Sequence, residues 1–95
     1  MQNSLNTYVI ERPLPGAGQL SDKELHGIAT KSNTVLRELG PDVQWVHSYV
    51  TGDKIYCVYR AKNTDIIREH ARCGGFPVEA INRVASVIDP TTGAS

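Results

Sequence analysis

Three groups of side chains in this sequence have the residue types that bind transition metals or move protons. The first group is His47 with three aromatic neighbours, Trp45, Tyr49 and Tyr56. An imidazole beside a carboxylate can act as a general base or bind a divalent metal ion, and Glu11 is a candidate carboxylate from another strand. The alternative is a histidine that only makes hydrogen bonds across a dimer interface. The residue types support both interpretations equally.

The second group pairs Cys57 with His70, and the third places His70 beside Glu69 and Cys73 on one helix. A thiolate and an imidazole together suit nickel, copper or zinc, and the imidazole could instead activate the cysteine as a nucleophile. For Cys57 and His70 we favour a simpler interpretation, a buried histidine bonded to backbone or to a tyrosine, beside an inert core thiol. Residues three and four apart are neighbours on a helix surface, but such pairs are common by chance.

Familiar catalytic motifs are missing from the sequence. It has no H-E-x-x-H, no C-x-x-C, no glycine-rich phosphate loop and no nucleophile elbow. An enzyme would therefore depend on an aromatic pocket formed by Trp45, Tyr49 and Tyr56. We favour a protein without catalytic activity.

Length and composition predict one small domain over residues 1–95, with an ordered core of about 7–90 and terminal tails at 1–6 and 91–95. Ten basic and ten acidic residues leave no net charge, which argues against a nucleic-acid partner. We also expect no membrane partner, because no apolar run is long enough to cross a bilayer. Without a secretory signal, and with only two cysteines, we expect a cytoplasmic protein with reduced thiols.

A β-hairpin around Gly52-Asp53 is expected to organise the chain, because valine, isoleucine and aromatic residues dominate both flanks. This turn places Val50 opposite Ile55 and His47 opposite Val58, and an unbroken register places Trp45 opposite Arg60. Alternation then predicts a core face and an open aromatic face. The core face would carry Val46, Ser48, Val50, Ile55, Cys57 and Tyr59, and the open face Trp45, His47, Tyr49, Tyr56, Val58 and Arg60.

The remaining elements follow from strand and helix signals. A strand is expected at 7–12, where Tyr8, Ile10 and Arg12 share a face. Ser21 and Glu24 form a capping box for a helix that ends at Gly40. A second helix is expected from the cap around Asn63 to Gly74-Gly75, followed by a helical turn at 78–82 and a last strand at 83–89.

The order strand, helix, strand, strand, helix, strand predicts an α+β, ferredoxin-like βαββαβ fold. Right-handed crossovers put both helices on one face of a four-stranded antiparallel sheet. The opposite face would be bare and aromatic, and bare apolar faces usually mark an interface. We therefore expect a homodimer.

Several segments resemble a family of small bacterial ferredoxin-like proteins that bind nickel. They are E-L-G-P-D-V-Q-W-V-H-S-Y-V-T, Y-C-V-Y, I-R-E-H-A, G-F-P and V-I-D-P-T-T, and the resemblance spans Tyr8 to Thr92. It implies a homodimer that binds a divalent transition metal, Ni²⁺, with a role in nickel sequestration or homeostasis. The candidate metal ligands are Glu11, His47, Cys57, Glu69 and His70. The alternative is a dimeric α/β-barrel-type enzyme or small-molecule binder that uses the aromatic open face around His47.

Overall fold

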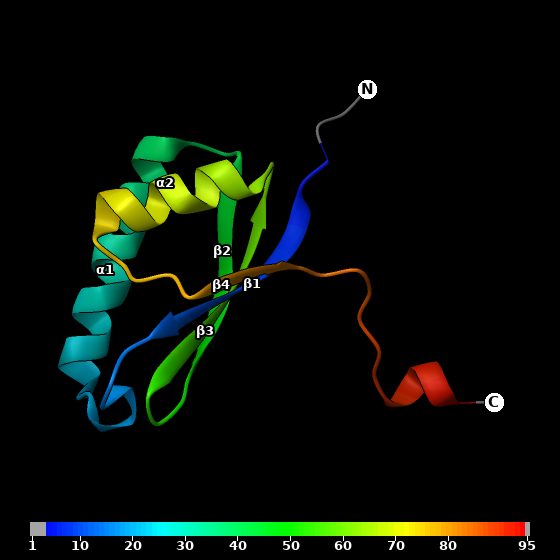
Figure 1. The fold of residues 1–95 in the computed structure, drawn as a ribbon, viewed down its shortest axis with the longest axis horizontal. Helices are drawn as coiled ribbons and strands as arrows, with labels where there is room; N and C mark the ends of the chain where they lie inside the picture. Colours follow the sequence, from blue (N-terminus) through cyan, green and yellow to red (C-terminus); the bar gives the residue numbers. More distant parts are fainter. Residues whose placement is uncertain (1–3, 95) are drawn as a thin grey trace.

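The computed structural model describes residues 4–94 and has the expected βαββαβ order (Figure 1). The strands form an antiparallel sheet in the order β2-β3-β1-β4, and both helices cover one face of it. This confirms the ferredoxin-like α+β fold. The elements are β1 (Asn6–Pro13), α1 (Asp22–Leu39), β2 (Val43–Val50), β3 (Lys54–Ala61), α2 (Thr64–Gly74) and β4 (Ala80–Arg83), with short 3-10 turns at Ala17–Gln19 and Pro90–Gly93.

The two helices begin and end where their caps predict. The Ser21 hydroxyl accepts from the Glu24 backbone N–H at 3.1 Å, and the Glu24 carboxylate accepts from the Ser21 N–H at 2.9 Å. The Asn63 side chain accepts from the N–H of Ile66 and starts α2. Gly75 ends α2 with a φ of 70°, a conformation that glycine adopts without strain. Within residues 4–94, neither helix is long and apolar enough to cross a membrane.

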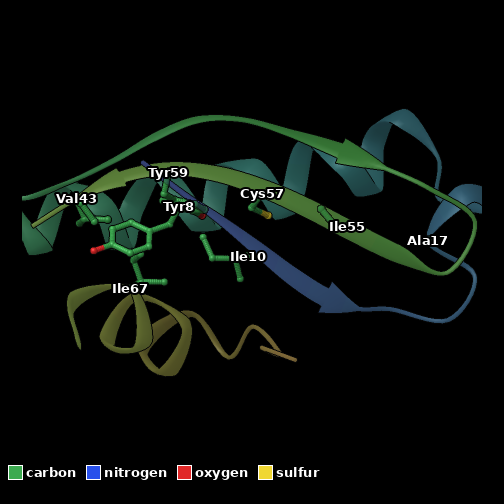
Figure 2. Close-up of a cluster of buried hydrophobic side chains, with 9 residues drawn as sticks. Tyr8, Ile10, Ala17, Val43, Ile55, Cys57, Tyr59 and Ile67 are labelled. Carbon is green, nitrogen blue, oxygen red and sulfur yellow. The ribbon is translucent and has the colours of Figure 1, made fainter. Parts of the chain in front are cut away.

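The core lies between the sheet and the helices. Ile10 of β1 and Ile67 of α2 are fully buried there, with Tyr59 of β3 beside them (Figure 2). The face of β3 that carries Ile55, Cys57 and Tyr59 points inward, as the alternation predicts. Burial of these apolar surfaces is the main force that holds the helices on the sheet.

The hairpin register is confirmed near the turn and wrong at its far end. Val50 pairs with Ile55 and His47 pairs with Val58, but Trp45 pairs with Tyr59 rather than Arg60. A β-bulge at Val46, between Trp45 and His47, inserts one extra residue into β2. The insertion turns Trp45 to the helix-covered face, where it packs against the core, and leaves Val46 exposed.

The C-terminal strand also differs from expectation. The predicted helical turn at 78–82 is replaced by β4, which pairs with β1, and of the predicted strand at 83–89 only Arg83 belongs to β4, while residues 84–89 have no regular structure. Ile81 opposite Ile10 sets this register, because it places an apolar side chain against the core. Beyond Val84 the chain leaves the sheet and extends away from the body of the molecule (Figure 1).

Regular structure extends close to both ends of the described residues. Asn6 already belongs to β1, and residues 90–93 form a turn capped by Asp89. Val87 and Ile88, which fall within the predicted strand at 83–89, are 79% and 78% exposed. Residues 1–3 and 95, which also belong to the predicted tails, lie outside the described part of the chain.

Candidate functional site

A cavity of about 740 Å³ lies between α1 and the inner face of the sheet. Its lining is mostly apolar and comes from β1, β2, β3, α1 and the segment after α2. Volumes of this size are typical of sites for small molecules. The lining includes Leu14, Ile28, Trp45, Ile55, Cys57 and Tyr59.

Trp45 and Cys57 are therefore cavity residues. Our prediction that Trp45 joins Tyr49 and Tyr56 on the open face is wrong, because the bulge in β2 reverses its side. The Trp45 indole N–H donates to the hydroxyl of Ser48 at 2.9 Å, which satisfies its polar group at the cavity wall. Cys57 is buried and free, and Cys73 is exposed and free.

Arg12 is one of two cations that line the cavity, and the other is Lys31. Its side chain is only 5% exposed, its Nη1 donates to the Pro77 carbonyl at 2.9 Å, and its buried Nη2 has no partner within the described chain. The guanidinium carbon lies 5.9 Å from the ring centre of Tyr59 and 5.4 Å from that of Phe76. The sequence signal for this position was its alternation with Tyr8 and Ile10, which groups Arg12 with these residues on one face.

His70 is a buried structural residue on α2, as the favoured interpretation holds. Its Nε2 lies 3.1 Å from the Ser32 hydroxyl on α1, whereas we expected backbone or a tyrosine as the partner. Its ring centre lies 5.3 Å from Tyr59 and 5.4 Å from Phe76. Burial, together with the charge of Arg12, lowers the pKa of His70 to about 4, so the ring is neutral near pH 7. Burial also raises the pKa of Tyr59.

The open face of the sheet carries His47, Tyr49 and Tyr56. His47 is exposed and makes an edge contact with Tyr49 at 4.9 Å between ring centres, and Tyr49 is 59% exposed. Glu11 shares this face, but β3 separates its strand from that of His47. Two strand spacings amount to about 10 Å. His47 and Glu11 of one subunit are therefore poorly placed to hold the same metal ion.

Glu11 is also engaged within its own subunit. Lys54 Nζ lies 3.1 Å from the Glu11 carboxylate and 3.2 Å from that of Glu79. The hydrogen bond to Glu11, and after it the bond to Glu79, raises the pKa of Lys54. A metal ion at Glu11 would have to displace this ammonium group.

The third candidate group divides between the two sides of α2. Glu69 and Cys73 are neighbours, with 3.5 Å between the carboxylate and the thiol, and Arg72 donates to the same carboxylate. These hydrogen bonds lower the pKa of Glu69, with Arg72 as the largest cause. His70 faces the core, so it does not join them.

The donor atoms of residues 4–94 in one chain do not form a complete metal site. Within residues 4–94 no three side chains of His, Cys, Asp or Glu come together to hold a metal ion. Transition metals in proteins usually take three or more protein ligands. The imidazole of His47 and the carboxylate of Glu11 are both suitable nickel ligands. Each would need further ligands from outside the described part of its own chain to complete a site.

The fold and these sites define a small ferredoxin-like protein with an interior cavity and an exposed imidazole on its bare sheet face. The family described as nickel responsive protein SCO4226-like matches residues 8–84, so the chain belongs to this family. The crystal structure of SCO4226 from Streptomyces coelicolor A3(2) is similar, with a TM-score of 0.73 at 13% sequence identity. The match covers 86% of this chain and 99% of that one. No curated protein matches the chain.

Proposed function

We propose that this protein binds nickel and serves in its sequestration or homeostasis, as a homodimer that completes the metal site between two copies. Membership of a nickel-responsive family supports the choice of metal. The observation that carries the shared site is the separation of His47 from Glu11 by β3 on one open face. Both are suitable ligands. Among the described residues, neither belongs to a group of three side chains that could hold a metal ion within one chain.

A symmetric dimer would overcome this separation. In a two-fold symmetric interface, every contact between two different residues occurs twice, once in each direction. His47 of each copy can therefore meet Glu11 of the other copy. The exposed Val46 and Tyr49 on β2, and Val87 and Ile88 beyond β4, are apolar surface that a second copy would cover. We also propose a cytoplasmic location, where the free thiols of the chain would stay reduced.

Nickel binding by tag-free protein tests this proposal, with isothermal titration calorimetry as the measurement. His47→Ala should lower nickel affinity by at least tenfold. His26→Ala is the matched control, because it removes another exposed imidazole, from α1. Wild-type affinity in His47→Ala would contradict the proposed site. Equal losses in both variants would mean that exposed histidines bind nickel without a specific site.

The alternative of a small-molecule pocket on the open face receives less support. The described cavity lies on the opposite, helix-covered face, and Trp45 belongs to it. Tyr49 and Tyr56 remain on the open face, where the proposed dimer would bury them. The candidates Cys57 and His70 on the inner side, and Glu69 on α2, are secondary to His47 and Glu11 in this proposal.

A further inference from the structure

The cavity between α1 and the sheet is lined by a buried cation, Arg12, that has no ion-pair partner within the described residues. Arg12 is nine-tenths buried or more, lines the cavity, and makes its hydrogen bond through Nη1 alone. Its Nη2 is buried and unpartnered, and no ion pair to Arg12 exists within the described chain. Arginine stays protonated in proteins, so this charge is permanent. A buried cation without an anion is costly, and a ligand could supply that anion.

The groups around Arg12 do not supply a negative charge. Tyr59 and Phe76 offer ring faces, and His70 is a neutral imidazole that is already bonded to Ser32. Glu24 also lines the cavity and carries a negative charge, but its carboxylate accepts from the Ser21 N–H at the start of α1 and forms no ion pair with Arg12 within the described residues. The remaining cavity wall includes a second cation, Lys31, and the hydroxyls of Ser32 and Ser48, and is otherwise mostly apolar, with Leu14, Ile28 and Ile55.

From this arrangement we infer that the cavity binds a small amphipathic carboxylate. The carboxylate would accept a charge-assisted hydrogen bond from the Arg12 guanidinium, and the apolar body would lie against Trp45, Cys57 and Ile55. The volume of about 740 Å³ holds a molecule of this class. This site is on the opposite side of the sheet from His47, so the inference does not depend on the proposed nickel function.

The chain provides two reporters of cavity occupancy. Trp45 is the single tryptophan of the sequence, so its fluorescence reports on the cavity wall. Cys57 is the cavity thiol, and in a Cys73→Ser background its rate of modification by a thiol reagent reports on access to the same space. The probe ligands are decanoate and 1-decanol, which share a ten-carbon body and differ in the anionic head group.

The wild-type protein should bind decanoate at least tenfold more tightly than 1-decanol, as measured by Trp45 fluorescence below the micellar concentration. Decanoate should also slow the modification of Cys57. Arg12→Met should remove the preference for decanoate by a similar factor while 1-decanol affinity changes little. Arg60→Met is the matched control, since this exposed arginine lies on the other face of β3.

Three results would overturn the inference. If neither ligand alters the Trp45 signal or the Cys57 rate, the cavity is not a binding site. Equal affinity for the two ligands in the wild-type protein would show an apolar cavity without an anion site, and this comparison needs no variant to fold. A preference for decanoate that persists in folded Arg12→Met would assign anion recognition to another group. Nickel affinity should be unchanged in Arg12→Met, which separates this site from the metal site.

Discussion

The hydroxyl of Ser32 on α1 lies 3.1 Å from Nε2 of His70 on α2, and both side chains are buried. This hydrogen bond joins the two helices beneath the sheet. The second ring nitrogen of His70, Nδ1, is buried without a partner within the described chain. Ser32 is therefore the hydrogen-bond partner of the imidazole within the described residues. Protonation of His70 would place a second cation beside Arg12.

Acid should destabilise the protein through His70. Its folded-state pKa of about 4 lies below the ordinary value of 6.5, so the unfolded chain binds the extra proton between these pH values. The contribution of His70 to the free energy of unfolding is therefore fully present above pH 6.5. It decreases by up to about 3 kcal/mol as the pH falls toward 4. Urea unfolding of the wild type and of His70→Gln should show this loss only in the wild type. Parallel pH profiles for the two proteins would contradict it.

Ser32→Ala should lower the free energy of unfolding by about 1–3 kcal/mol, because it leaves a buried nitrogen of His70 without its partner. Denaturant unfolding at pH 7 measures the effect. Ser86→Ala is the control, since Ser86 is exposed and outside the helices and strands. A change no larger than that of the control would mean that the hydrogen bond between the helices contributes little.

Ser21→Ala should destabilise the protein by about 1 kcal/mol, as the loss of an N-cap usually does. Ser21 accepts from the Glu24 N–H at the first turn of α1, and alanine cannot replace that acceptor. Thermal unfolding gives the measurement, and nickel affinity should stay at the wild-type value. An unchanged melting temperature would refute the contribution of this cap.

Much of the fold could be predicted from the sequence because its signals are local. The capping box at Ser21, the cap at Asn63 and the helix ends at Gly40 and Gly75 depend on side chains within a few residues. The strand order follows from the connections between elements. The hairpin register near Gly52 follows from the turn.

The errors have a different physical origin. The bulge at Val46 lacks a glycine or proline as a marker, and it depends on how Trp45 fits the cavity wall and reaches Ser48. The position of β4 depends on the packing of Ile81 against the core, which a local pattern does not encode. Alternation groups Arg12 with Tyr8 and Ile10 but does not decide which face of the sheet they occupy, and the missing partner of Arg12 is a property of the folded structure alone.

Lys54→Met should increase nickel affinity severalfold if Glu11 is a ligand. Lys54 occupies the Glu11 carboxylate and adds a positive charge beside it, and methionine removes both effects. Lys62→Met controls for the change in net charge at an exposed position. Titration calorimetry compares the two variants, and equal affinities would remove Glu11 from the proposed site.

The proposed function is tested most directly by sedimentation velocity with the nickel content of each species measured across the boundary. We predict that nickel migrates with a species of two chains, and that His47→Ala carries less than a tenth of the wild-type nickel at the same concentrations. Nickel that migrates with a single chain at full wild-type affinity would contradict a site shared between two copies.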